Sequence, residues 1–170
     1  ILKKLSLNPN IEDDFIDKNI SLEKYVKEII TSFNEISDKN FIINTEQNYN
    51  SFEISKSIEI VYGIRNFIGN ANKFSKKNIF VSITSDSETS SISIEDDGTG
   101  FPKDILSRVG EPYVKSLEPR NKSKSGLGLG IFIGKTLLEK NYAKILIRNS
   151  ETRGGAEIKI EWSNKDLLNI

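Results

Sequence analysis

Three stretches in which apolar and polar residues alternate do most to limit how this chain of 170 residues can fold. Two of them, NIFVSIT and SSISIED, are joined through the polar segment SDSET, which predicts a hairpin over residues 78–96. The third lies near the end of the chain, where Ile158, Ile160 and Trp162 alternate with charged residues. Strict alternation is typical of strands with one buried and one solvated face, so we expect a mostly antiparallel sheet.

Helical spacing of apolar residues predicts a second layer. Ser21 is a suitable N-cap for a helix that runs to about Phe33, and a longer helix is expected over residues 55–75. A short strand is expected at residues 40–47 between them. Together these elements predict an α/β two-layer sandwich, with a mixed, mostly antiparallel sheet and helices on one face.

Composition excludes several kinds of chemistry. The chain has 24 basic residues (Lys and Arg together) and 24 acidic residues (Asp and Glu together). Charge therefore does not indicate nucleic acid or an anionic membrane as a partner. The absence of cysteine and histidine excludes disulfides, thiolate catalysis and cysteine-bound zinc, and it removes the commonest general base. No apolar run approaches the roughly 20 residues that span a bilayer. Because methionine is absent as well, we expect a fragment of a longer protein.

The helix expected over residues 55–75 carries a polar stripe. At about 100° per residue, Asn66, Asn70 and Lys73 fall within about 60° of one another, and the flanking Gly63 and Gly69 are expected to leave this stripe uncrowded. Asparagine suits an exposed helix face poorly, and glycine costs about 1 kcal/mol there. Such choices indicate a site where two carboxamides and an ammonium hold a metal ion and its phosphates. The alternative is the solvated face of an amphipathic helix.

The stretch EDDGTGFP, residues 95–102, follows a predicted strand. Gly98 and Gly100 allow sharp turns and the close approach of a ligand. The carboxylate of Asp97 can accept a hydrogen bond from an exocyclic amine such as adenine N6, whereas guanine presents an oxygen there. The alternative is an ordinary Asp-Gly turn at the end of a strand. Glu95 and Asp96 have no assigned role, and solvation at the strand edge is expected for both.

The stretch SGLGLGIFIGKTLLEK, residues 125–140, contains a GKT tripeptide that is not a Walker A loop. Position 129 is Leu where that motif needs glycine, and the tripeptide lies inside an apolar helix. What remains is a glycine-rich loop leading into a helix N-terminus, which suits phosphate, although a flexible hinge is an alternative. The polar segment 109–125 has two prolines and no periodicity, so we expect a mobile lid there.

Together these motifs resemble the Bergerat ATP-binding fold of gyrase B, mismatch-repair ATPases, heat-shock chaperones and sensor histidine kinases, over residues 21–162. NFIGNANKFS resembles a histidine-kinase N box, DDGTGFP a G1 box, GLGLGIFIGKTLLE a G2 box and RGGAEIKIEW the closing G3 strand. GEPYV with Lys115 resembles a degenerate F box, in which Tyr113 replaces the usual Phe and Lys115 the usual Arg. YGIRNFIGNA, GEPYV and GLGLGIFIGKTLLE together resemble the RegB/PrrB type of redox-responsive kinase, many of which have an acidic residue where Lys73 stands.

The resemblance implies that the chain binds ATP with Mg²⁺ and transfers the γ-phosphoryl group to a histidine on its own dimerisation domain. It implies Asn70 as the Mg²⁺ ligand with Asn66 in support, and it places Lys73 and a lid cation such as Lys115, Arg120 or Lys124 near the phosphates. The implied ATP-binding residues are Asn66, Asn70, Lys73, Asp97, Gly98, Gly100, Lys115, Ser125, Gly126, Leu127, Gly128 and Gly130.

The resemblance also implies an organisation for the whole protein. Residues 1–20 would be the end of a dimerisation helix and a linker, residues 21–165 the catalytic ATP-binding domain, and residues 166–170 a tail. The isolated chain would be a monomer, the full protein a homodimer in the bacterial inner membrane with this domain in the cytoplasm, and its target a response regulator. A gyrase-type ATP-hydrolysing module and a non-catalytic regulatory domain remain as alternatives.

Overall fold

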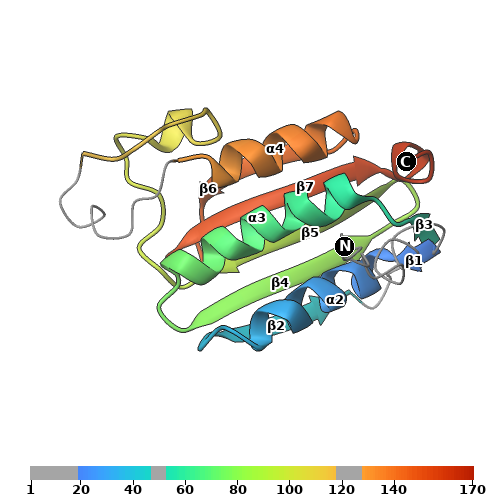
Figure 1. Ribbon diagram of the computed structural model, residues 1–170, viewed down its shortest axis with the longest axis horizontal. Coiled ribbons are helices and arrows are strands. Elements are labelled where there is room, and N and C mark those ends of the chain that lie inside the picture. Colours follow the sequence, from blue (N-terminus) through green and yellow to red (C-terminus); the bar gives the residue numbers. More distant parts are fainter. Residues whose placement is uncertain (1–18, 47–52, 118–127) are drawn as a thin grey trace, which may run out of the picture.

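A five-stranded mixed sheet forms one layer of the fold, in a computed structural model that describes residues 19–46, 53–117 and 128–170 (Figure 1). Its strands are β2 (Asn40–Thr45), β4 (Asn78–Ser85), β5 (Thr89–Asp96), β6 (Lys144–Asn149) and β7 (Ala156–Ser163), in the order β2-β4-β5-β7-β6. β2 pairs with β4 in parallel, and the other neighbouring strands are antiparallel. The mixed, mostly antiparallel sheet and the hairpin over residues 78–96 are therefore confirmed.

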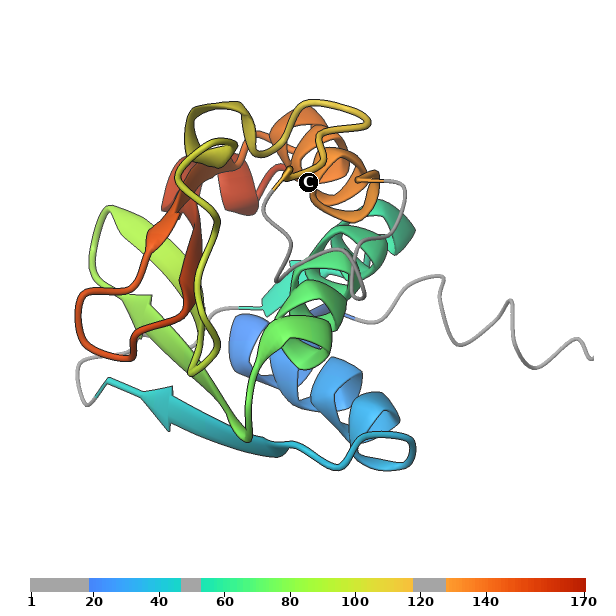
Figure 2. The same ribbon diagram turned by 90° about the vertical axis from the view of Figure 1, so that its left-hand side faces the viewer.

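Three helices, α2 (Leu22–Asn34), α3 (Ile58–Phe74) and α4 (Gly130–Lys140), cover one face of this sheet (Figure 2). Ser21 caps α2 as predicted, since its Oγ accepts a hydrogen bond from the backbone N–H of Lys24 at 3.2 Å. Ser57 caps α3 through the N–H of Ile60. In the ranges that the structure describes, no helix is both long and apolar enough to cross a membrane.

Alternation along the strands places one set of side chains in the core between sheet and helices. The large apolar side chains that β4, β5 and β7 bury are Ile79, Val81, Ile83, Ile92, Ile94, Ile158, Ile160 and Trp162. They pack against buried residues of the helices, among them Tyr25, Phe67 and Leu138. The other face of the sheet carries partly exposed polar residues such as Ser82 and Lys159, so the predicted division into a buried and a solvated face is confirmed.

The smaller elements lie at the edges of this sandwich. They are a two-stranded sheet of β1 (Asn19–Ser21) and β3 (Glu53–Ser55), the 3-10 helix η1 (Leu106–Arg108) and the short helix α5 (Asn164–Leu167). The sequence predicts a tail at residues 166–170, but Leu167 is fully buried and Ile170 packs against the core. The predicted helix end and linker, apart from its last two residues, lies outside the described residues.

Two glycines bring α3 and α4 close together. A Cβ atom on Gly63 would lie 2.5 Å from Leu138 Cγ, and one on Gly134 would lie 2.7 Å from Phe67 Cε1. Gly134 thus serves helix packing, which agrees with the rejection of a Walker A loop. Gly63 also serves helix packing. The sequence had instead predicted that it leaves the polar stripe uncrowded. Gly69 differs, because a Cβ atom there would meet nothing closer than 3.8 Å.

Candidate active site

A cavity of about 640 Å³ lies between α3, the segment that follows β5, and the N-terminus of α4. This volume is in the range of small-molecule binding sites. Its polar and charged wall includes Arg65, Asn66, Asn70, Lys73, Asp96, Glu111, Lys115 and Ser116, and its apolar wall includes Phe74, Phe101, Pro102, Ile105, Val109, Val114 and Ile131. The cavity therefore offers an apolar surface beside convergent polar groups.

The polar stripe of α3 faces this cavity, as the helical spacing predicts. Asn66, Asn70 and Lys73 all line it. The Nδ2 of Asn66 donates to the carbonyl of Tyr62 at 2.8 Å, while its Oδ1 lies 3.8 Å from the position that a Cβ atom on Gly130 would take. Asn70 makes no side-chain hydrogen bond, and Lys73 no ion pair, with any described residue. The carboxamide of Asn70, the Oδ1 of Asn66 and the ammonium of Lys73, which lies 5.4 Å from the centre of the Phe74 ring, are thus available to a ligand.

Asp96, for which the sequence predicts only solvation at the strand edge, instead contributes a buried carboxylate to the cavity wall. Only 1% of the residue is exposed, and its Oδ1 accepts the N–H of Gly98 at 2.8 Å. Burial raises the pKa of the Asp96 carboxyl, although hydrogen bonds from the N–H groups of Gly98 and Ala156 oppose this shift, and neighbouring Asp97 adds to it. A Cβ atom on Gly155 would lie 2.1 Å from Oδ1 of Asp96, so only glycine fits there.

Asp97, which the sequence predicts as the adenine-reading residue, does not line the cavity. Its carboxylate accepts hydrogen bonds from the backbone N–H groups of Lys76, Lys77 and Asn78 at 2.8, 3.0 and 2.9 Å. Desolvation opposes ionisation, but these bonds outweigh it and hold the pKa of Asp97 below its usual range. Asp97 therefore ties the turn between α3 and β4 to the end of β5.

The direction of the two aspartates follows from the register of β5. This strand ends at Asp96, so Ile92, Ile94 and Asp96 lie on the same, core-facing side. Asp97 comes after the strand and turns toward the α3–β4 connection. Continuing the alternation by one step would have identified Asp96.

The glycines that follow have separate roles. Gly98 does not line the cavity, and a Cβ atom there would lie 2.3 Å from the carbonyl oxygen of Phe74. Gly100 lines the cavity with a φ of +74°, a conformation that favours glycine. The next residue, Phe101, is held by a reciprocal pair of hydrogen bonds, because its N–H donates to Asn149 Oδ1 at 2.6 Å and its carbonyl accepts from Asn149 Nδ2 at 3.0 Å.

Residues at the N-terminus of α4, together with Lys115, form another wall of the cavity. Gly128 and Gly130 line it, as does Lys115. Gly130 is the first residue of α4, whose N-terminus therefore opens into the cavity and suits an anion. Other predicted residues, Arg120, Lys124, Ser125, Gly126 and Leu127, lie outside the described residues, as does the rest of the expected lid beyond residue 117.

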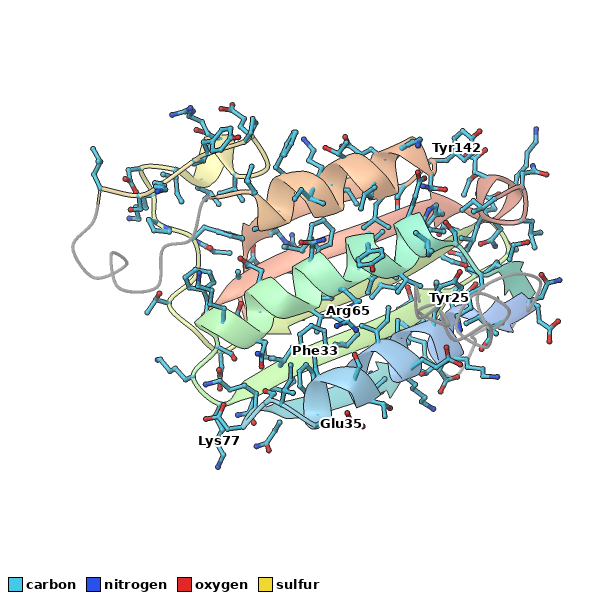
Figure 3. The ribbon with its side chains drawn as sticks, viewed as in Figure 1. Tyr25, Phe33, Glu35, Arg65, Lys77 and Tyr142 are labelled. Carbon is cyan, nitrogen blue, oxygen red and sulfur yellow. The ribbon has the colours of Figure 1, made fainter. Side chains whose placement is uncertain are left out.

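Helical spacing also places residues at the cavity that the sequence interpretation did not select. Tyr62 lies one turn before Asn66 and lines the cavity. Arg65 also lines it, but its guanidinium points from α3 toward α2, where it lies 5.1 Å from the centre of the Phe33 ring and donates to Ser32 Oγ at 2.5 Å (Figure 3). The period of α3 was sufficient to find Tyr62, which shares a face with the asparagines, whereas Arg65 lies about 100° around the helix from Asn66.

A metal ion in this cavity would depend on amide ligands and on a bound anion. Within residues 19–46, 53–117 and 128–170, no three acidic side chains gather as they would around an ion. The carboxamide oxygen of Asn70 is a hard ligand of the kind that Mg²⁺ accepts together with substrate phosphates. The residues present therefore fit a Mg²⁺ ion that enters with a phosphate ligand.

Comparison with known proteins gives three results. The sequence profile of the family described as Histidine kinase-, DNA gyrase B-, and HSP90-like ATPase matches residues 55–166. Sensor histidine kinase RegB of Cereibacter sphaeroides is 32% identical over 119 residues, which cover 61% of this chain and 26% of RegB. Sensor protein SrrB of Staphylococcus aureus is 31% identical over 93 residues, which cover 54% of this chain and 16% of SrrB. The matches thus span about a quarter or less of these relatives.

The fold is also found among solved structures. The mycobacterial sensor histidine kinase MprB superposes with a TM-score of 0.70 at 19% identity, covering 86% of this chain and 97% of that one. At this identity the likeness concerns the fold, and it matches the two-layer sandwich described above.

Proposed function

We propose a binding mode and a reaction for this chain, which belongs to the histidine kinase-, DNA gyrase B- and HSP90-like ATPase family as the catalytic, ATP-binding domain of a sensor histidine kinase. In this mode ATP occupies the 640 Å³ cavity with adenine at Asp96 and the triphosphate beside Asn66, Asn70 and Lys73. The observation that carries the proposal is the convergence of a buried carboxylate and an amide and ammonium stripe on one cavity.

Asp96 would select adenine. Its carboxylate accepts the exocyclic amine of adenine, whereas guanine would present a second acceptor to it. Because the N–H groups of Gly98 and Ala156 already orient the carboxylate, binding costs this side chain little further conformational entropy. The role that the sequence suggested for Asp97 is thereby proposed for its neighbour.

The phosphates would lie along α3 and the N-terminus of α4. Asn70 is the proposed Mg²⁺ ligand, with Asn66 in support, and Lys73 and Lys115 contribute positive charge from two sides of the cavity. Bound Mg²⁺ would neutralise part of the phosphate charge. Gly128 and Gly130 let the backbone approach the anion closely at the helix N-terminus.

The proposed reaction is transfer of the γ-phosphoryl group to a histidine of the dimerisation domain. A nitrogen of that imidazole forms a bond to the γ-phosphorus, the bond from this phosphorus to the β–γ bridging oxygen breaks, and ADP leaves. This chain contains no histidine, so the acceptor must come from another segment. Since positioning and electrostatics carry most of phosphoryl transfer, a site without a general base can serve.

The organisation of the full-length protein is inferred from its relatives. We infer a homodimeric full-length kinase in the bacterial inner membrane, with this domain in the cytoplasm and a response regulator as the final phosphoryl acceptor. The 32% identity to RegB over 119 residues supports redox control of the RegB type. We place the dimerisation helix and linker in residues 1–20 and the catalytic domain from residue 21.

Calorimetric titration with nucleotides tests the binding mode. The unaltered chain should bind ATP in the presence of Mg²⁺, bind it more weakly with EDTA, and show no comparable affinity for GTP. Binding of GTP as tightly as ATP would contradict the assignment of Asp96 to adenine. Equal ATP affinity with and without Mg²⁺ would contradict the role of Asn70.

A further inference from the structure

Asp104 lies after the cavity-lining segment at Phe101, and its carboxylate binds a part of the chain twelve residues further on. The hydroxyl of Ser116 donates to Oδ1 at 3.0 Å and to Oδ2 at 3.2 Å, and the backbone N–H of Leu117 donates to Oδ2 at 3.1 Å. One side chain therefore closes residues 104–117 into a loop. We call this contact of Asp104 with Ser116 and Leu117 the Asp104 clasp.

The first end of this loop is fixed to the sheet. Phe101, three residues before Asp104, exchanges two hydrogen bonds with the side chain of Asn149 in β6. The N–H of Ile105 donates to the carbonyl of Pro102 at 3.2 Å, which keeps the intervening turn tight. The clasp is thus built on a backbone segment whose position is set by β6.

The second end of the loop is fixed to the segment that precedes α4. A Cβ atom on Gly128 would lie 2.5 Å from the carbonyl oxygen of Val114 and 2.9 Å from its nitrogen. Gly128 has a φ of +70°, so both its conformation and this contact require glycine. Lys115 therefore stands between two fixed points, the Val114 contact on one side and the clasp on the other.

Lys115 is the group that this arrangement presents to the cavity. It lines the cavity wall, and it forms no ion pair with any residue that the structure describes. Among the residues that the structure describes, the two carboxylates nearest to it in sequence are engaged, since Asp104 holds the clasp and Glu111 pairs with Arg108 at 3.1 Å. Its ammonium is thus available to an anionic ligand, and fixing the backbone beside it removes part of the ordering cost of binding.

We propose that Asp104 is a positioning residue of the nucleotide site, whose clasp holds Lys115 where it meets the phosphates of ATP. This inference rests on the proposed function, because it requires nucleotide phosphates in the cavity. Asp104 itself does not touch the nucleotide. Its effect must therefore pass through Lys115 and concern the phosphates rather than the base.

A comparison of ATP with adenosine separates positioning from a general structural role. Calorimetry on the whole chain should show that Asp104→Ala weakens ATP binding by about tenfold, the size expected for a charge-assisted contact. The affinity for adenosine should stay unchanged. Lys115→Ala should produce the same selective loss, and the double variant should bind ATP no more weakly than Lys115→Ala alone. Asp104→Glu should restore part of the affinity.

Asp86→Ala provides the matched control. Asp86 also holds a loop with its carboxylate, through the N–H groups of Glu88 and Thr89 in the turn between β4 and β5, at the end of the sheet away from the cavity. This variant should leave both affinities unchanged. Equal losses of ATP and adenosine affinity in Asp104→Ala, or losses that multiply in the double variant, would contradict the inference alone. Failure of the unaltered chain to bind ATP would contradict the proposed function as well.

Discussion

Asp96 and Asp97 are adjacent in sequence, but their carboxylates bind different parts of the molecule. Oδ1 of Asp96 accepts the N–H of Gly98 at 2.8 Å on the cavity wall, whereas Oδ1 of Asp97 accepts the N–H of Lys76 at 2.8 Å behind the end of α3. Their pKa values are displaced in opposite directions, because burial dominates for Asp96 and hydrogen bonds for Asp97. We therefore propose that Asp96 recognises the ligand and that Asp97 stabilises the fold.

Asp96→Asn should weaken ATP binding without destabilising the fold. Loss of the charged acceptor for the adenine amine should reduce affinity by about 10- to 100-fold, and the new amide can orient its NH₂ group toward the base. Because burial raises the pKa of Asp96, its ionised form costs folding free energy at neutral pH, so the uncharged variant should melt at the same or a higher temperature. Calorimetry and thermal unfolding measure the two effects, and unchanged ATP affinity would argue against the proposed binding mode.

Asp97→Ala should destabilise the fold and change ATP binding little. Removing the acceptor of three backbone N–H groups should lower the free energy of unfolding by about 1–2 kcal/mol, after allowance for partial exposure to solvent. ATP affinity measured well below the melting temperature should change much less than in Asp96→Asn. A variant as stable as the unaltered chain would show that these hydrogen bonds contribute little.

The pH dependence of stability provides an independent check on Asp97. Its pKa is lowered in the folded chain, so its contribution is complete above the unfolded-state pKa, near 3.8, and is lost as the pH falls through the folded-state value. Asp97→Ala should therefore be less stable than the unaltered chain at pH 7, and the difference should shrink on acidification below about pH 4. Urea unfolding across this range measures it, and a difference that grows with acidification would contradict the sign.

Two helix glycines should respond differently to alanine. Gly134→Ala places a methyl group against Phe67, so it should cost about 1–3 kcal/mol of stability through overpacking. Gly69→Ala meets no atom closer than 3.8 Å and replaces a poor helix former, so it should raise stability by up to about 1 kcal/mol. Chemical denaturation of both variants measures these shifts. Equal effects would mean that the packing of α3 on α4 is not as close as described.

Periodicity made much of this fold predictable. Alternation located β4, β5 and β7, and helical spacing both located α3 and placed Asn66, Asn70 and Lys73 on one face, because these patterns depend only on local geometry. The role predicted for Gly63 was wrong, because glycine is required there by the Leu138 side chain, which is seventy-five positions away in the sequence. Long-range contacts of this kind leave no periodic signal.

The site was less predictable than the fold for the same reason. Whether Asp96 or Asp97 faces the cavity depends on where β5 ends, and strand ends are set by tertiary contacts such as those of Asp97 with the α3–β4 turn. Position 155 requires glycine because the pairing of β7 with β5 brings Gly155 against Asp96, and the sequence alone does not show this contact. The Asp104 clasp likewise joins residues that have no pattern in common.

Asn66 bears on whether the domain hydrolyses ATP by itself. A carboxamide cannot accept a proton at neutral pH, and its Nδ2 is already bonded to the carbonyl of Tyr62. General-base assistance is worth about 10²–10⁴-fold, so phosphate release should be slow by that order. Steady-state phosphate release should stay slow in the unaltered chain and in Asn66→Ala. It should rise in Asn66→Glu, whose carboxylate can act as a base. Several turnovers per second from the unaltered chain would favour an ATP-hydrolysing module instead.

Transfer of labelled phosphate tests the central claim most directly. The chain has no histidine, so incubation with γ-³²P-ATP and Mg²⁺ should leave it unlabelled. Addition of a separate dimerisation domain with its phosphoacceptor histidine should give label on that domain, labile in acid and stable in alkali. Asp96→Asn should reduce this transfer at low ATP concentration. Acid-stable label on the chain itself, with none on the added domain, would contradict the assignment as a histidine kinase catalytic domain.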